Sequence, residues 1–391
     1  MRVAAVIAEF NPFHNGHAHL MNEVRRAGAQ WIVAVMSGCY VQRGEPALYS
    51  KWVRARAALL SGVDLVLELP LPYAISGAQR FARGAAALCG ALGCVDTLAF
   101  GCEAPRLADL QRTRALLDSP RLPALLAEEQ RARPGITFAA ARTAALCRLG
   151  GEAAAQTAAE PNNALALEYL AALRTEGGAI EPFAVRRVGA GHDSPLPEGR
   201  FASATALRTR ILAGEDAAPY LPAAALPVYE EAPRLDRTAF ETALLSHLRR
   251  LGKEELARLP ELSEGLEHRL YAAIREARTL EELYRRMKSK RYTHARLRRL
   301  ALAAFLGVED RHTRMPPPYL RILGYTAAGR ELIEGGRARL PLGGSLRRLE
   351  RLGGPCEEFA ALEAAAGDQY ALFSRPRSGC GCEYTAGVLH F

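Results

Sequence analysis

Two histidines near the start of the chain have the spacing of a phosphate-binding pair. They belong to the segment Phe10-Asn11-Pro12-Phe13-His14-Asn15-Gly16-His17, which follows an apolar run and precedes a helical pattern. Histidines three apart at a helix start can face one bound group, donate hydrogen bonds to its phosphate oxygens and add charge when protonated. Gly16 lets the backbone approach a ligand closely, because glycine has no side chain. The segment favours a nucleotide site; exposed loop histidines, or a metal site that includes His19, are the alternatives.

The first hundred residues supply the elements that would position this segment. Strands are predicted at residues 3–8, 31–36, 64–69 and 97–101, and helices at residues 16–26, 50–60 and 78–92. Strands that are apolar at consecutive positions and alternate with helices predict a parallel sheet covered on both faces. Right-handed crossovers then give a doubly wound, Rossmann-like α/β domain. Such a sheet binds phosphate where a strand's carboxyl end meets a helix N-terminus, which is where the histidines lie.

Two later segments carry polar groups at predicted helix starts. Ser203-Ala204-Thr205-Ala206-Leu207-Arg208 opens a helix that runs to about residue 212. Hydroxyls at a helix N-terminus with an arginine one turn on favour a triphosphate clamp, and a plain capped helix is the alternative. Asn162 and Asn163 precede another helical pattern. They are suited to reading a base edge or a ribose, or simply to a turn and an N-cap.

These segments together resemble a known family. His14-Asn15-Gly16-His17 resembles the signature of the HIGH-type nucleotidyltransferase superfamily, and the segment from Ser203 to Arg208 is similar to its Ser-x-Thr-x-x-Arg motif. With Ser37-Gly38, Leu67-Glu68-Leu69-Pro70, Phe100-Gly101 and residues 161–169 and 186–193, the chain resembles the bacterial tRNA(Met) cytidine acetate ligase family. The resemblance continues through residues 290–293 and 318–325, so it covers most of the chain.

The resemblance implies a two-step reaction. Such enzymes make acetyl-adenylate from ATP and acetate, release pyrophosphate, and acetylate N4 of the wobble cytidine of elongator tRNA(Met) to give N4-acetylcytidine. For this reaction we expect His14 and His17 to act in catalysis by stabilising the α- and β-phosphate oxygens in the transition state. We expect Ser203, Thr205 and Arg208 to hold the leaving pyrophosphate with Mg²⁺, and no covalent enzyme intermediate is needed. The family's ATP contacts map onto Ile7, Ala8, Glu9, Phe10, Asn11, Pro12, Phe13, His14, Asn15, Gly16, His17, Ala18, His19, Leu20, Gly101, Asn162 and Arg187.

The second part of the chain is basic and helical in pattern. An Ala- and Pro-rich stretch at residues 216–227 predicts a boundary between an ATP-binding domain, residues 1–215, and a mainly α-helical domain, residues 216–391. Residues 283–308 contain no acidic side chain, and Tyr284 and Tyr292 could stack on bases. This segment is a candidate tRNA-binding surface, and the alternative is a basic helix face that is simply solvated. The candidates for tRNA phosphate contacts are Lys288, Lys290, Arg291 and Arg296.

Composition limits the remaining possibilities. The 391 residues are 49% hydrophobic and 24% charged, with a net charge of +9, which excludes a wholly disordered chain and permits a polyanionic partner. We expect no membrane span, no signal peptide and no disulfide framework, and therefore a reducing, cytoplasmic compartment. Cys380, Cys382 and His390 form an incomplete zinc set, so free thiols and no metal site are predicted.

Other functions stay open from the residues alone. A small-metabolite adenylyl- or cytidylyltransferase shares both nucleotide motifs but does not need the long basic second half. A non-enzymatic RNA-binding module would leave the histidine segment without a role. The sequence gives no indication of the oligomeric state.

Overall fold

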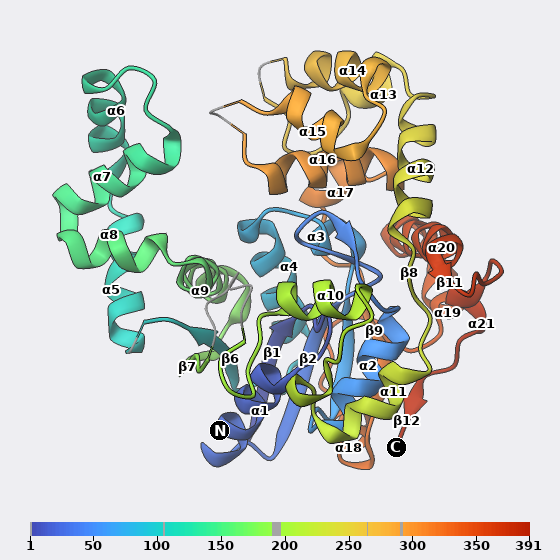
Figure 1. Cartoon of the computed structure of the whole chain (residues 1–391). Helices are drawn as coiled ribbons and strands as arrows, with labels where there is room; N and C mark the ends of the chain where they lie inside the picture. Colours follow the sequence, from blue (N-terminus) through green and yellow to red (C-terminus); the bar gives the residue numbers. More distant parts are fainter. Residues whose placement is uncertain (1, 105, 190–196, 264, 290–291) are drawn as a thin grey trace.

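A computed structural model describes residues 2–104, 106–189, 197–263, 265–289 and 292–391 (Figure 1). Its centre is an eight-stranded sheet with the order β10-β9-β5-β2-β1-β6-β7, in which β12 also pairs with β9. The strands are β1 (Val3–Ala8), β2 (Trp31–Ser37), β5 (Leu65–Leu69), β6 (Thr97–Cys102), β7 (Glu181–Arg186), β9 (Leu320–Tyr325), β10 (Leu342–Gly343) and β12 (Leu389–His390). Neighbours from β5 to β7 pair in parallel, which confirms the predicted doubly wound sheet.

Alternate residues of the central strands enter two cores, one on each face of the sheet. Ala4 and Val6 of β1 pack into the first core, while Val3 and Ala5 pack into the second. Helices α1 (Asn15–Arg26) and α2 (Lys51–Leu60) cover the first face, and α4 (Ala78–Leu92) and α9 (Pro161–Ala172) cover the second. The consecutive apolar positions of these strands are therefore explained by burial on both sides.

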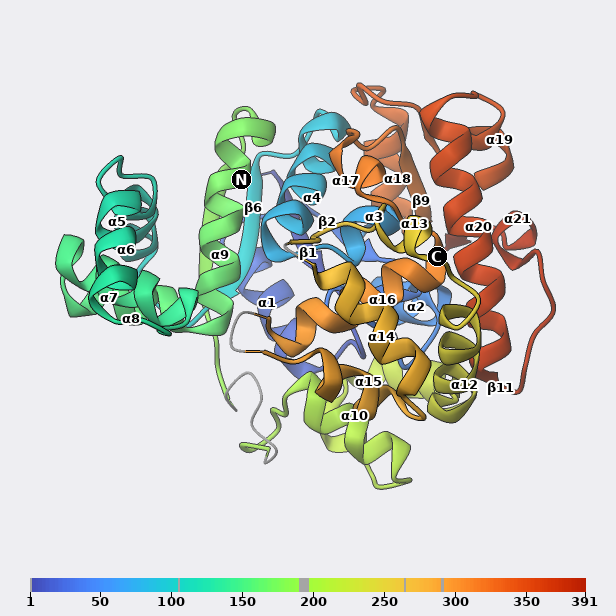
Figure 2. The same cartoon turned by 90° about the horizontal axis from the view of Figure 1, so that it is seen from above.

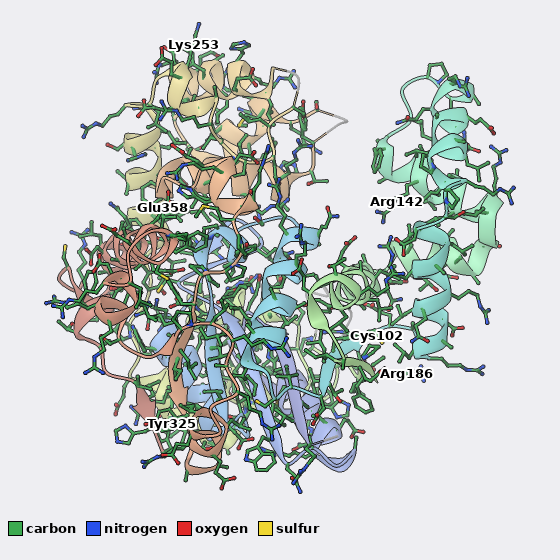
Figure 3. All side chains as sticks on the ribbon, turned by 180° about the vertical axis from the view of Figure 1, so that it is seen from behind. Cys102, Arg142, Arg186, Lys253, Tyr325 and Glu358 are labelled. Carbon is green, nitrogen blue, oxygen red and sulfur yellow. The ribbon has the colours of Figure 1, made fainter. Side chains whose placement is uncertain are left out.

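A helical arm stands away from the body between β6 and α9. It consists of α5 (Leu107–Leu117), α6 (Leu122–Ala132), α7 (Phe138–Gly150) and α8 (Glu152–Ala159). Seen from above, the arm extends to one side and α9 lies between it and the sheet (Figure 2). Cys102 and Arg186, partners across β6 and β7, lie near the root of the arm (Figure 3).

The second part of the chain forms a helical cap and then returns to the sheet. After the turns at Ala218–Tyr220 and Ala223–Ala225, the cap joins the first core through several of its buried side chains. Helix α10 (Ala204–Leu212) precedes the cap. The helices of the cap are α11 (Leu226–Glu230), α12 (Arg237–Leu248), α13 (Lys253–Leu256), α14 (Leu266–Glu276), α15 (Leu280–Met287), α16 (His294–Leu306) and α17 (Asp310–Arg314). The chain ends with α18 (Ala327–Glu334), α19 (Leu346–Glu350), α20 (Pro355–Phe373) and α21 (Cys382–Thr385).

The return to the sheet adds strands that the sequence did not indicate. β9 pairs antiparallel with β5, and β10 and β12 lie along its other edge, so residues from both sides of position 216 share one sheet. Short elements complete the fold: α3 (Leu71–Ala74), a hairpin of β3 (Tyr40–Val41) and β4 (Glu45–Pro46), and a pair of β8 (Arg234–Leu235) and β11 (Ser374–Arg375). The parts before and after residue 216 share one sheet and one continuous core. The division into two domains at this residue stays a prediction.

Candidate active site

The turn that leaves β1 is tightly held. Phe10 adopts a positive φ of 46°, which is unusual for a residue with a side chain and is a form of strain found at functional turns. Its ring is buried 4.8 Å from the ring of Phe13. The backbone N–H of Phe13 donates to the hydroxyl of Tyr229 at 2.8 Å, which ties the turn to α11 in the cap. The fold therefore fixes the backbone immediately before the two histidines.

The two histidines form a reciprocal cap at the N-terminus of α1. His14 Nδ1 accepts the backbone N–H of Gly16 at 3.0 Å, and His17 Nδ1 accepts the backbone N–H of His14 at 3.2 Å. The ring centroids lie 3.9 Å apart. Because both Nδ1 atoms are acceptors, each neutral ring carries its proton on Nε2. The pair therefore offers two Nε2–H donors.

The glycine between the histidines leaves room for the His14 ring of this cap. A Cβ at Gly16 would lie 2.9 Å from Cε1 of His14. We expected the missing side chain of Gly16 to leave space for a ligand. The contact shows that the His14 ring lies in this space.

Burial keeps the histidine rings neutral. It lowers the pKa of His14 to about 3, and the charges of Arg187 and Arg208 act in the same direction. Burial also lowers the pKa of His17 well below its usual value, with further contributions from His14 and Arg187. The expectation that a protonated ring adds charge is therefore wrong for the ligand-free site. Near neutral pH both rings act as uncharged hydrogen-bond donors.

A cavity of about 250 Å³ opens beside these rings, at the carboxyl ends of β1 and β6. The strand order reverses between these two strands, which is where open α/β sheets bind ligands. The predicted residues that line it are Ile7, Ala8, Glu9, Phe10, Asn11, His14, Gly16, His17, His19, Leu20, Gly101, Asn162, Arg187 and Arg208. The segments named from the sequence therefore meet at one cavity.

Some predicted residues support the cavity without lining it. Pro12, Phe13 and Ala18 are absent from the described lining. The side-chain Nδ2 of Asn15 donates to the carbonyls of Arg200 and Pro219, at 2.9 and 3.0 Å, so it holds neighbouring loops. These residues position the turn.

The start of α10 brings one charged group to the cavity. Arg208 Nη1 donates to the carbonyl of Asn11 at 3.0 Å, and its Nη2 donates to Thr205 Oγ1 at 3.2 Å. Ser203 Oγ accepts the N–H of Ala206 at 3.0 Å, which makes Ser203 the N-cap of α10. Neither Ser203 nor Thr205 is among the lining residues that the structure describes. Of the predicted clamp, Arg208 is the member that borders the cavity.

The two asparagines at the start of α9 have different surroundings. Asn163 is buried, and its Oδ1 accepts the backbone N–H groups of Glu103 and Ala104, each at 2.9 Å. The Glu103 carboxylate in turn accepts the N–H of Asn162 at 3.2 Å and that of Asn163 at 2.8 Å. Asn163 therefore anchors the loop after β6 and is not the N-cap, which is Glu160. Asn162 borders the cavity and stays the candidate for a nucleoside contact.

Sequence reasoning missed part of the lining. Gln42 and Arg43 come from the hairpin of β3 and β4, and Phe81 and Tyr169 come from helices on the second face. No local motif marks them, because they reach the cavity only through the three-dimensional packing of distant segments.

The basic segment of the cap is described in part. Lys288 is exposed, and its Nζ donates to the carbonyl of Tyr292. Arg296 is half-buried, and its guanidinium donates to the carbonyl of Glu261 and, at 3.1 Å, to Ser263 Oγ. Lys290 and Arg291 lie outside the described residues.

The expectation that Tyr284 and Tyr292 stack on bases is wrong for this conformation. Both rings are buried, and the guanidinium groups of Arg298 and Arg296 lie over them. The segment therefore presents charge, not aromatic surface.

The part of the chain that the structure describes contains no group of three or more His, Cys, Asp or Glu side chains arranged to hold a metal ion. All eight cysteines, including Cys380 and Cys382, are free thiols. No helix within the described ranges combines the length and apolar character needed to cross a bilayer.

Fold and cavity together define the class of protein. The family described as HIGH Nucleotidyl Transferase matches residues 1–379 of this chain, which include the capped histidine pair. The tRNA(Met) cytidine acetate ligase of Syntrophotalea carbinolica is 40% identical over 93% of this chain and 91% of its own length. That of Caldanaerobacter subterraneus is 36% identical over 85% and 86%.

Solved structures give the same result. Thermotoga maritima TmcAL in its apo form aligns with a TM-score of 0.91 and 30% identity, covering all of both chains. The same protein bound to alpha-thio ATP aligns with a TM-score of 0.89 and 30% identity over 100% of this chain and 99% of that one. The chain is a HIGH nucleotidyl transferase, and within that class it belongs to the tRNA(Met) cytidine acetate ligase family.

Proposed function

We propose that this protein is an ATP-dependent ligase that activates acetate as acetyl-adenylate and transfers the acetyl group to N4 of the wobble cytidine of elongator tRNA(Met). The observation that carries the proposal is the neutral pair of Nε2–H donors, which a helix cap holds in the lining of the switch-point cavity. The printed names of the relatives, tRNA(Met) cytidine acetate ligase, support acetate as the acid and tRNA(Met) as the acceptor. These relatives match both parts of the chain, which favours the ligase over a small-metabolite nucleotidyltransferase.

The first step needs charge stabilisation more than a base. Acetate is already an anion, and its oxygen attacks the α-phosphorus of ATP while pyrophosphate leaves. His14 and His17 donate from Nε2 to phosphate oxygens on which negative charge develops. Neutral donors fixed before the substrate arrives need no reorganisation during the step. Arg208 and the N-terminus of α10 stabilise the departing pyrophosphate.

Mg²⁺ enters this proposal as part of the substrate. Glu9 is the single carboxylate among the described residues that line the cavity, so the protein alone supplies few ligands for a hard cation. The triphosphate oxygens would hold Mg²⁺ and carry it into the site. Its contribution there is to neutralise phosphate charge.

The tRNA backbone is proposed to lie on the basic segment of the cap. Lys288 is exposed, and we keep Lys290, Arg291 and Arg296 as further candidates for phosphate contacts. Free thiols throughout suit the reducing cytosol in which such an enzyme would meet tRNA.

Acetate-dependent exchange of pyrophosphate into ATP tests the first step. His17→Ala should reduce the exchange rate on the order of a hundredfold or more, because one preorganised donor in such a site contributes about 3–4 kcal/mol. His17→Asn keeps an acceptor for the His14 N–H but lacks the Nε2–H, so it should show a similar loss without loss of the cap. His268→Ala, at an exposed position on α14, is the matched control. Near-normal exchange by a folded His17→Asn protein would refute the assigned role.

A further inference from the structure

Glu9 is a carboxylate in a cavity that should otherwise attract anions. It follows β1, and no other acidic side chain occurs among the described lining residues. Its Oε1 accepts the backbone N–H of Gln42 at 2.9 Å, which orients the carboxylate from the hairpin of β3 and β4. Its own backbone carbonyl accepts a hydrogen bond from the buried Arg54. A site for a triphosphate gains nothing from a negative charge, so the position of Glu9 calls for a different explanation.

The surroundings of Glu9 favour a proton acceptor over a metal ligand. Burial raises its pKa, and this effect exceeds the opposing effects of Arg43, Arg208 and the Gln42 N–H. The two arginine charges that act on the carboxylate also disfavour a second cation beside it. The charged and titratable groups that act on Glu9 are Arg43 and Glu45 from the hairpin, Arg208 from α10, Arg54 from α2 and Tyr169 from α9. The same cavity is also lined by His14, His17, His19, Arg186 and Arg187.

The second half of the proposed reaction needs an acceptor for one proton. The N4 amine of cytidine attacks the acetyl carbonyl carbon, and the nitrogen must lose a hydrogen as the amide forms. His14 and His17 cannot take it, because each Nδ1 already accepts a backbone N–H and each Nε2 already carries hydrogen. His19 also lines the cavity, and the pH dependence of Glu9→Gln described below distinguishes it from Glu9. Tyr169 cannot take it either, because burial raises the pKa of its hydroxyl and keeps it protonated. Arginine side chains remain charged at any relevant pH.

We propose that Glu9 is the general base that takes the proton from the attacking N4 amine of the tRNA cytidine. This inference rests on the proposed function. One C–N bond forms between N4 and the acetyl carbon, and the bond between that carbon and the adenylate phosphate oxygen breaks. AMP leaves as the phosphate anion, and the proton resides on the Glu9 carboxyl until solvent removes it. A raised pKa makes this carboxylate a stronger base than one in water.

The experiment separates the two half-reactions. Acetate-dependent ATP–pyrophosphate exchange reports adenylate formation, and single-turnover transfer from preformed enzyme-bound [¹⁴C]acetyl-adenylate to tRNA reports the second step. Glu9→Gln keeps the shape of the side chain and an oxygen for the Gln42 N–H. Transfer should fall by about 10²–10⁴-fold, the usual contribution of a general base, and exchange should fall far less. Glu9→Asp should recover part of the transfer rate.

Glu23→Gln is the matched control, because it removes a carboxylate on α1 that pairs with Arg26 and is absent from the described cavity lining. It should leave the ratio of the two rates within about threefold of wild type. The wild-type transfer rate should rise with pH to a plateau, and Glu9→Gln should lose that dependence. Equal losses in both half-reactions, or recovery of Glu9→Gln by added Mg²⁺, would overturn the proposal. Absence of exchange in the wild-type protein would instead refute the proposed function.

Discussion

Replacing the buried Glu363 with glutamine should stabilise this protein, and the gain should grow as the pH rises. Glu363 lies on α20 within a solvent-excluded ionic cluster that joins the last helices to the sheet. In this cluster Lys51 Nζ lies 2.5 Å from both Glu68 and Glu383, and Arg321 Nη1 lies 2.9 Å from Glu68 and 2.6 Å from Glu383. Two cations thus balance two carboxylates, and a third carboxylate has no positive partner of its own.

The size of the effect follows from the pKa of Glu363. Burial, together with the charges of Glu68 and Glu383, raises this pKa from 4.5 to about 8, against the opposing effects of Lys51 and Arg321. Between these two values the unfolded carboxyl ionises while the folded one keeps its proton, so stability falls as pH rises. Each pH unit is worth about 1.4 kcal/mol. From pH 4.5 to pH 7 the cost reaches about 3 kcal/mol, and a glutamine does not incur it.

Glutamine also preserves the local contact. The backbone N–H of Leu71 donates to Glu363 Oε1, and the amide oxygen of the introduced glutamine can accept it in the same way. Urea denaturation of the wild-type and Glu363→Gln proteins from pH 5 to pH 8.5 measures the difference. Glu357→Gln, an exposed change on the same helix, is the control and should show a difference near zero at every pH. A stability difference that is independent of pH would show that Glu363 stays ionised in the fold.

Two further predictions concern the active site and the tRNA. Because burial lowers the pKa of His14 to about 3 and that of His17 well below 6.5, acetate-dependent exchange should show no histidine titration between pH 5.5 and pH 8. A rate that rises or falls tenfold per pH unit in this window, and that disappears in His17→Asn, would contradict neutral donors. Replacing Lys288 and Arg291 together with alanine should flatten the salt dependence of log K for tRNA binding by about 1.5, since each phosphate contact contributes about 0.7–0.9. Filter binding at several salt concentrations measures this slope, and an unchanged slope would place the tRNA elsewhere.

The elements near the first motif could be predicted closely because their signals are local. The helix predicted at residues 78–92 is α4 without change, and Ser50, the first residue of the helix predicted at residues 50–60, is the N-cap of α2. β9 was missed because its short apolar run contains Arg321, a residue that looks unsuited to a buried strand. That arginine is fully buried because Glu68 and Glu383, from distant segments, pair with it. The burial of Arg321 therefore depends on Glu68 and Glu383, which are distant in the sequence, and the residues of β9 alone do not predict it.

The same reasoning applies to side-chain roles. Leu283, Tyr284 and Met287 are buried on one face of α15, while Arg285 and Arg286 point to solvent. Helical spacing alone predicts that this face of α15 is buried. The expectation that Tyr284 stacks on bases was wrong because it followed the basic composition of the segment and not its periodicity. The neutrality of the histidines could not be predicted, because their pKa values depend on burial and on Arg187 and Arg208.

The spacing of the histidine motif follows from helix capping before any nucleotide is considered. A helix start leaves backbone N–H groups without partners, and a reciprocal cap needs its two acceptors at the N-cap and N3 positions. His14 and His17 occupy these positions, and a Cβ at the N2 residue, Gly16, would crowd the His14 ring. Capping through Nδ1 then leaves hydrogen on each Nε2, which is the atom a phosphate oxygen can meet. Replacing Gly16 with alanine should therefore impair exchange by displacing a ring from the cap, even though glycine itself donates nothing from a side chain.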